Sequence, residues 1–140
     1  MTYWDSSALV VLYVRQSRSD EVRAVAGQDA RLVTWTLSDI EVRSALARLE
    51  RDGLVPEAGV RQARDEAARH WQYIDTVSTV DGVKARARRV LNLHPLRAAD
   101  ALQLGAAILA AGDDPSGHAF VTLDERLAAA ARREGFTVLP

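Results

Sequence analysis

The sequence predicts an α/β domain in which a central, mainly parallel sheet is covered by helices. Three observations lead to this class. Short apolar segments of strand type alternate with longer segments in which apolar residues recur at helical spacing. The long middle of the chain carries helical segments with no strand between them, which indicates a helical insertion on one side of the sheet. The 140 residues, 48% of them apolar and 26% charged, are enough for one globular domain over residues 1–140.

The predicted strands are short, apolar and bounded by polar residues. The segment "ARLVTW" follows the polar "GQD", and "MTYW" runs directly into an aspartate. The predicted strands cover residues 1–4, 30–35, 118–123 and 136–140.

The predicted helices have an apolar stripe and a recognisable start or end. Ser6 or Ser7 is available to cap the first helix, Pro56 begins a later one, and Gly53 and Gly135 end two others. The predicted helices cover residues 6–16, 20–26, 38–53, 56–75, 80–93, 98–111 and 124–135. The residues that we expect to face the core from two of these helices are Ile40, Val42, Leu46, Val83, Ala87, Val90 and Leu91.

Charge and composition exclude several classes of function. A net charge of −1 gives no global basic field that would attract nucleic acid, although it is compatible with a local basic patch. The absence of cysteine excludes disulfides, thiolate zinc sites and cysteine nucleophiles, and it fits a cytoplasmic protein. The longest apolar run, residues 98–111, is too short to span a membrane and contains Asp100 and Gln103, so we expect no membrane association.

Four carboxylates fall just after predicted strands or at the starts of predicted helices. Asp5 follows the first strand, and Asp124 follows the strand over residues 118–123. Glu41 lies in the first turn of the helix after "ARLVTW". Asp100 begins its helix in line with the apolar Leu104, so its side chain is expected to point inward. Because ligands bind beyond the carboxyl ends of the strands in a parallel sheet, we expect these four acids to converge there.

Each acid also has a purely structural interpretation. Asp5 and Asp124 suit turn or helix-capping positions, and Ser38 with Glu41 has the spacing of a capping box. Asp100 would complement the dipole of its helix. The joint pattern favours a functional site, because clustered carboxylates repel one another unless a cation compensates them. An all-oxygen set suits Mg²⁺ or Mn²⁺ better than zinc, and such a site points to phosphate chemistry.

Four stretches of the chain are similar to one protein family over its whole length and in its order. They are "YWDSSALVVLYV", "TLSDIEVRSALARL", "LRAADALQLGAAILA" and "FVTLDERLAAAARREGF". The sequence resembles the PIN-domain ribonucleases, specifically the VapC-like toxins of bacterial type II toxin–antitoxin pairs. The resemblance implies a three-layer α/β/α fold, a homodimer, an RNA substrate and inhibition by a small VapB-like antitoxin.

The resemblance also implies roles for particular residues. In the family, four acids bind Mg²⁺ or Mn²⁺ and catalyse hydrolysis. The residues of this sequence that match them are Asp5, Glu41, Asp100 and Asp124. Two hydroxyl residues, Ser6 and Thr122, match the family's positions beside the first and fourth acids. The implied reaction is attack of a metal-activated water on an RNA phosphodiester, which gives a 5′-phosphate and a 3′-hydroxyl. Whether Glu41 binds metal directly, binds it through water or orients the nucleophile is left open.

Other residues give weaker indications. Arginines close in sequence to the acids or at the end of the first helix are candidate RNA contacts, namely Arg15, Arg43 and Arg97. Trp4, Trp35 and Trp71 are expected mainly to pack. The three histidines have no metal-like spacing and are expected at helix surfaces or in loops: His70, His94 and His118.

Two other functions fit the sequence less well than a nuclease. A response-regulator-like phosphoryl-transfer domain needs several acids near the first strand and a well-placed lysine. This chain has only Asp5 there, and its one lysine, Lys84, falls within a helix. The second alternative is a non-catalytic PIN-fold module that binds a protein partner, and the complete set of acids weighs against it.

Overall fold

The computed structural model describes residues 1–28 and 31–140, and in it a parallel sheet separates two layers of helices. The strands run in the order β3-β2-β1-β4-β5, and every neighbouring pair is parallel. Their bounds are β1 Thr2–Trp4, β2 Leu32–Trp35, β3 Asp75–Val77, β4 Ala119–Val121 and β5 Thr137–Leu139. The predicted parallel sheet is therefore confirmed. The second predicted strand began at residue 30, which lies outside the described residues.

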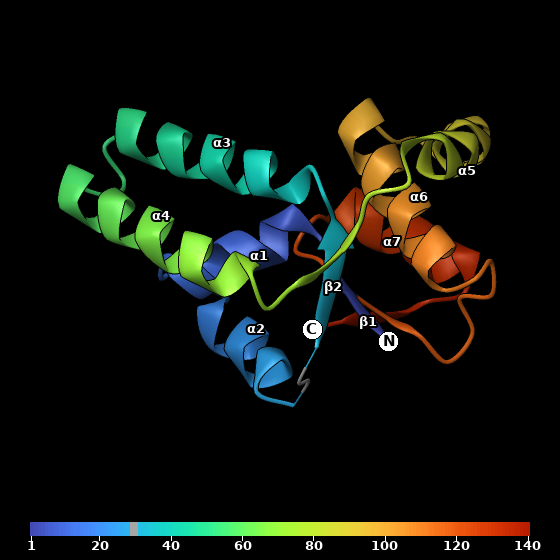
Figure 1. Ribbon diagram of the computed structural model, residues 1–140, viewed down its shortest axis with the longest axis horizontal. Helices are drawn as coiled ribbons and strands as arrows, with labels where there is room; N and C mark the ends of the chain where they lie inside the picture. The colour runs from blue at the N-terminus through green and yellow to red at the C-terminus, as the bar shows by residue number, and fades with distance from the viewer. Residues whose placement is uncertain (29–30) are drawn as a thin grey trace.

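The helices divide into two groups, one on each face of the sheet (Figure 1). One face is covered by α1 Ser6–Tyr13, α2 Ser19–Ala26, α3 Ser38–Arg51 and α4 Glu57–Trp71. The other is covered by α5 Val80–Leu93, α6 Ala98–Ala110 and α7 Glu125–Glu134. Each group has its own hydrophobic core against the sheet, which gives the three layers that the family resemblance implies.

Successive side chains of β1 point to opposite faces of the sheet and pack into different cores. Tyr3 packs into the α5–α7 core and stacks on Phe120, whereas Trp4 packs into the α1–α4 core with Val121. Trp35 of β2 is likewise buried. The expectation that Trp4 and Trp35 are packing residues is confirmed. Because β1 is the central strand, the residue that follows it, Asp5, emerges in the middle of the sheet edge.

The middle of the chain contains a strand that the sequence analysis missed. The predicted helix over residues 56–75 ends at Trp71, and β3 follows and pairs with β2 at the edge of the sheet. Two of the three residues of β3 are exposed, so the segment lacks the apolar run that marks a buried strand. The first helix is also shorter than predicted, because Val14 is already extended.

Two burial predictions were wrong. Ile40 is 61% exposed, because α3 turns Val42 and Leu46 toward the core instead. Leu91 is 43% exposed, because α5 packs on α6 through other positions. His94 follows α5 in a loop, one of the two places expected for the histidines, but it is buried, and its Nε2 lies 2.7 Å from a carboxylate oxygen of Glu134.

A close contact between α5 and α6 fixes the helix that carries Asp100. A Cβ atom at Gly105 would lie 2.9 Å from both the backbone nitrogen of Ala87 and the carbonyl oxygen of Val83. Glycine therefore allows the two helix backbones to approach each other. Within the described ranges, no helix is long and apolar enough to cross a membrane.

Candidate active site

Asp5 stands at the carboxyl end of the central strand and is 3% exposed. It caps α1, because its Oδ2 accepts a hydrogen bond from the backbone N–H of Ser7 at 3.3 Å. The same oxygen accepts from the hydroxyl of Ser7 at 2.5 Å and from that of Thr122 at 2.9 Å. The hydroxyl of Ser6 lies 3.4 Å from the other oxygen, Oδ1. The predicted neighbours Ser6 and Thr122 thus contact Asp5, and Ser7 is a further contact that the sequence analysis did not assign.

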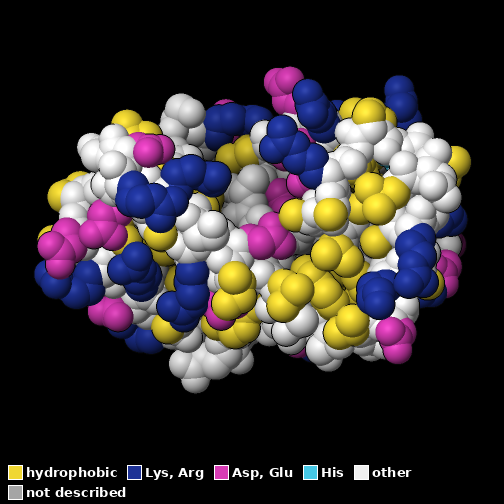
Figure 2. Space-filling view, turned by 90° about the horizontal axis from the view of Figure 1, so that it is seen from above, with side chains coloured by type: hydrophobic (Ala, Val, Ile, Leu, Met, Phe, Trp, Pro, Cys, Tyr) yellow, Lys and Arg dark blue, Asp and Glu magenta, His cyan; other side chains and the backbone are white. Residues whose placement is uncertain are grey.

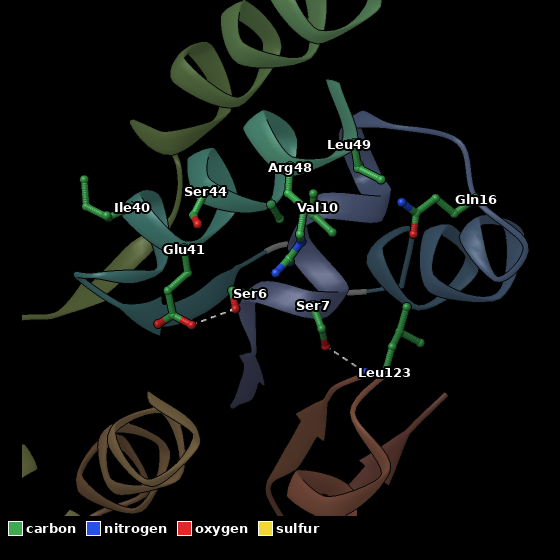
Figure 3. A pocket seen from close by; sticks show the side chains of 11 residues that line it. Ser6, Ser7, Val10, Gln16, Ile40, Glu41, Ser44, Arg48, Leu49 and Leu123 are labelled. Carbon is green, nitrogen blue, oxygen red and sulfur yellow. Dashed lines mark hydrogen bonds between the residues drawn. The ribbon is translucent and has the colours of Figure 1, made fainter. Parts of the chain in front are cut away.

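Glu41 lies in the first turn of α3 and is held by two hydrogen bonds. Its Oε2 accepts from the hydroxyl of Ser6 at 3.0 Å, and its Oε1 accepts from the side-chain amide of Gln103 at 2.9 Å (Figure 3 draws the first of these). The predicted capping box does not form. The capping position is Leu37, and the Ser38 hydroxyl lies instead within 2.8 Å of Thr34 Oγ1 and of the Gln103 amide nitrogen.

Gln103 is the site residue that sequence reasoning missed. Its side chain is fully buried on α6, and its amide nitrogen donates to both Glu41 and Ser38. Its Oε1 accepts the hydroxyl of Tyr3 at 2.7 Å, so each polar atom of the amide is satisfied. The only signal in the sequence is a polar residue inside an otherwise apolar helix. Such a residue is buried at a cost unless it finds partners.

Asp100 and Asp124 approach from the other side of the site. Asp124 caps α7, where its Oδ1 accepts from the backbone N–H of Leu127 at 2.8 Å. Asp100 lies in the first turn of α6 and is partly buried. Both acids line one hollow of about 600 Å³. Thr122 connects this side with Asp5, because its hydroxyl oxygen also accepts from the backbone N–H of Asp124 at 3.1 Å.

The carboxylates are electrostatic neighbours. Burial raises the pKa of Asp5, of Glu41 and of Asp100 above their ordinary values. The charge on Asp100 raises the pKa of both Asp5 and Glu41 further, and the charge on Asp124 does the same for Asp100. Contacts link the same residues in space. Ser6 contacts both Asp5 and Glu41. Thr122 contacts Asp5 and the backbone of Asp124, and Asp100 shares a hollow with Asp124.

The donor set fits a hard divalent cation. Among the described residues, no three acidic or histidine side chains lie close enough, as they stand, to hold one ion together. Mg²⁺ commonly binds through one or two carboxylates and keeps several waters, so it does not need three direct ligands. Ser6 lies between Asp5 and Glu41, with its hydroxyl 3.4 Å and 3.0 Å from their oxygens. A cation would offset the burial and repulsion that raise the carboxylate pKa values.

Two hollows flank the acids. The first, about 600 Å³, lies between α1 and α3 and contains Ser6, Glu41 and Arg48 together with apolar side chains (Figure 3). The second is the hollow of Asp100 and Asp124, and Arg48 lines this one as well. The complete lining of the first hollow is Ser6, Ser7, Val10, Gln16, Ile40, Glu41, Ser44, Ala45, Arg48, Leu49 and Leu123.

The candidate RNA contacts lie in different surroundings. Arg97 lines the hollow of Asp100 and Asp124. Arg15 forms an ion pair with Asp20 at 3.2 Å, and Arg43 forms one with Asp39 at 3.0 Å. Figure 2 shows the face seen from above, where Lys and Arg side chains gather over the half that contains α3 and α4, and apolar side chains gather over the other half.

Comparisons with known proteins agree on one family. The sequence pattern of the PIN domain family matches residues 2–133. Ribonuclease VapC45 and ribonuclease VapC49, from two strains of Mycobacterium tuberculosis, are each 33% identical to this chain over 141 residues, covering 100% of this chain and 95% of the relative. The crystal structure of Mycobacterium tuberculosis VapC20, described as a sarcin-ricin loop cleaving toxin, superposes with a TM-score of 0.66 at 18% identity, with both chains fully covered. The last similarity supports the fold.

Proposed function

Because this chain belongs to the PIN-domain family and, within it, to the VapC ribonucleases, we propose that it is a divalent-cation-dependent endoribonuclease, the toxin of a VapBC-like pair. The observation that carries the proposal is the placement of four carboxylates at the carboxyl edge of the sheet. Ser6 links Asp5 to Glu41, Thr122 links Asp5 to the backbone of Asp124, and Asp100 shares a hollow with Asp124. We propose Asp5, Glu41, Asp100 and Asp124 as the residues that bind Mg²⁺ or Mn²⁺ and carry catalysis. Bound there, a divalent ion supplies positive charge that acidifies water and stabilises the attacked phosphate.

The side chains of the chain divide the work. Asp5 and Asp124 each use one oxygen to cap a helix, so their backbone positions are fixed relative to the sheet. Glu41 is oriented by Ser6 and Gln103, which leaves it little freedom to turn away from the site. The Thr122 hydroxyl bridges the Asp5 carboxylate and the backbone N–H of Asp124, which fixes their relative positions. Hydrolysis breaks the P–O3′ bond, with hydroxide added to phosphorus and a proton delivered to the leaving 3′-oxygen.

The proposal is tested by incubating the purified chain with RNA in Mg²⁺, in Mn²⁺ and in EDTA. We expect cleavage with either ion, none in EDTA, and loss of at least about 100-fold in rate for Asp5→Asn and Asp100→Asn, the scale typical of losing a catalytic group. Asp81→Asn is the matched control, because Asp81 is also a first-turn acid but lies exposed on α5. Cleavage that persists in EDTA, or in both active-site variants, would refute the metal-dependent mechanism.

Calorimetry separates the nuclease from a non-catalytic PIN-fold module. We expect Mn²⁺ to bind the wild-type chain and to bind Asp100→Asn much more weakly. An absence of Mn²⁺ binding, or binding that Asp100→Asn leaves unchanged, would favour the module.

We also propose a homodimer, a VapB-like antitoxin as protein partner and, because the substrate is cellular RNA, a cytoplasmic location. The similarity to the VapC ribonucleases supports the antitoxin as partner. Sedimentation of the purified chain tests the dimer, and co-purification with an antitoxin encoded beside it tests the partner.

A further inference from the structure

The hollow of Asp100 and Asp124 is lined by three arginines. Arg48 lies in the last turn of α3, Arg97 precedes α6 as its capping residue, and Arg126 lies in the first turn of α7. All three are exposed and line this hollow. In the part of the chain that the structure describes, none of them pairs with a carboxylate within 4.0 Å.

Arg48 has a position that the other two lack. It lies two helical turns after Glu41 on α3, and Figure 3 shows Glu41, Ser44 and Arg48 following one another along the side of α3 that faces Ser6 and Ser7. Arg48 lines the hollow that contains Glu41 and also the hollow that contains Asp100. Arg48 therefore lies where the two hollows meet.

Positive and negative side chains balance in the hollow of Asp100 and Asp124. Its lining has three positive residues and three acids, Asp100, Asp124 and Glu125, so it has no surplus positive charge of its own. A nucleic-acid strand that enters it meets carboxylates that repel its phosphates. Arginine groups without ion pairs offset that repulsion, and their planar fork matches a phosphate. The first hollow has only Arg48 as a cation and has apolar walls, so it is less suited to phosphates.

We propose that the hollow lined by Arg48, Arg97 and Arg126 binds backbone phosphates of the RNA on one side of the carboxylates, and that Arg48 binds the phosphate at the junction of the two hollows. This inference rests on the proposed function, because it assigns the path of the substrate at the same site. It adds Arg48 and Arg126 to Arg97 as phosphate contacts. It also predicts that the sequence-independent part of RNA affinity comes from this side of the site.

The test is the salt dependence of RNA binding by the full chain. A fluorescein-labelled single-stranded RNA of 12 nucleotides is titrated in EDTA, with anisotropy read between 50 mM and 300 mM NaCl and the RNA checked on a gel afterwards. Each phosphate contact on a single strand contributes about 0.7 to the slope of log affinity against log salt. We expect Arg48→Ala and Arg126→Ala each to lower the slope by about 0.7, which corresponds to roughly eightfold weaker binding at 50 mM salt.

Arg51→Ala is the matched control for Arg48→Ala. Arg51 lies in the same last turn of α3, is exposed, has no ion pair among the described residues and lines none of the hollows described above. Both variants therefore lose the same favourable interaction with the helix dipole. We expect Arg51→Ala to bind RNA as the wild type does. Arg48→Lys keeps the charge, so it is expected to restore the slope.

Several results would overturn the inference. They are equal slopes for Arg48→Ala and Arg51→Ala, a slope that Arg48→Lys does not restore, and the absence of RNA binding by the wild type. Tighter binding of a poly-glutamate peptide than of RNA, dependent on Arg48, would assign the hollow to an acidic protein segment instead. RNA cleavage measured in parallel distinguishes the two proposals. A wild type that cleaves while Arg48→Ala binds normally contradicts only this inference, and Arg48-dependent binding without cleavage contradicts only the nuclease.

Discussion

Replacing Gln103 with methionine tests whether the buried amide holds the active site together. Methionine has nearly the same length and shape, but it removes the amide donor to Glu41 and Ser38 and the acceptor for Tyr3. The hydroxyl of Tyr3 then loses the acceptor of its proton, at a cost of about 1–3 kcal/mol, although Thr34 and the backbone of Trp35 stay within hydrogen-bonding reach of it. Glu41 loses a hydrogen bond to a charged group, worth about 1.5–3 kcal/mol. Burial of an apolar group offsets part of this loss. We expect the free energy of unfolding to fall by about 3 kcal/mol.

Urea denaturation in EDTA, followed by circular dichroism, measures this change. The midpoint is expected to fall while the slope with urea stays constant, which marks a change in stability alone. Gln62→Met is the control, because Gln62 is exposed on α4 and its replacement is expected to shift the free energy by less than about 0.5 kcal/mol.

A double-mutant cycle with Tyr3→Phe identifies the cause. Tyr3→Phe alone leaves the Gln103 carbonyl without its donor, but in the Gln103→Met background it removes a hydroxyl that has already lost its acceptor. The two substitutions together should therefore be less destabilising than the sum of both, by about 1–3 kcal/mol. A loss below about 1 kcal/mol for Gln103→Met, or additive effects in the cycle, would refute the role given to this amide.

Three further predictions concern pH and packing. Burial raises the pKa values of Asp5, Glu41 and Asp100, so without metal the folded state keeps protons that the unfolded state releases. In EDTA the free energy of unfolding should therefore fall as pH rises above about 4. Asp100→Asn should make this fall smaller in urea titrations. Glu134 behaves oppositely: although burial opposes it, the hydrogen bond from Arg89 holds its pKa below the ordinary value of 4.5, so its contribution is complete above that value and is lost as pH falls through the lowered pKa. Glu134→Gln should remove this acid-side loss, seen as a flatter unfolding midpoint below pH 4.5. Gly105→Ala should destabilise by about 1–3 kcal/mol in thermal melts, because its Cβ meets backbone atoms, whereas Gly59→Ala meets only side-chain atoms and should change stability less.

The parallel sheet and its carboxyl edge could be predicted from local signals in the sequence, whereas the three-layer order was implied only by the family resemblance. Apolar strands, helix caps and a residue just after each strand place Asp5 and Asp124 without knowledge of tertiary contacts. The strand β3 could not be predicted, because an exposed edge strand has no apolar pattern to reveal it. Ile40 was placed in the core because periodicity shows that α3 has an apolar side, but it does not show which residues at the helix end remain beyond the packed surface.

The contacts around Glu41 lay beyond the sequence for a different reason. Ser6, Glu41 and Gln103 come from α1, α3 and α6. Ser6, the hydroxyl donor, is 35 residues from Glu41 in the sequence, and Gln103, the amide donor, is 62 residues from it. No local pattern encodes a pairing over that distance. The local alternative was a capping box between Ser38 and Glu41. It does not form, because the Ser38 hydroxyl is already engaged by Thr34 and Gln103.

The structural and functional interpretations of the acids are compatible, because a carboxylate has two oxygens. In Asp5 one oxygen receives the Ser7 and Thr122 hydrogen bonds, and among the described residues the other has only the 3.4 Å contact with Ser6. In Asp124 one oxygen caps α7, and within the described residues no hydrogen bond to the other is present. Both oxygens of Glu41 are engaged. Helix capping thus fixes Asp5 and Asp124 while leaving each an oxygen for a cation. Each oxygen of Glu41 accepts one hydrogen bond and keeps a lone pair for a cation. Asp5 and Asp124 therefore offer the less engaged oxygens, and Glu41 can bind a cation directly or through a bound water in the orientation that Ser6 and Gln103 give it.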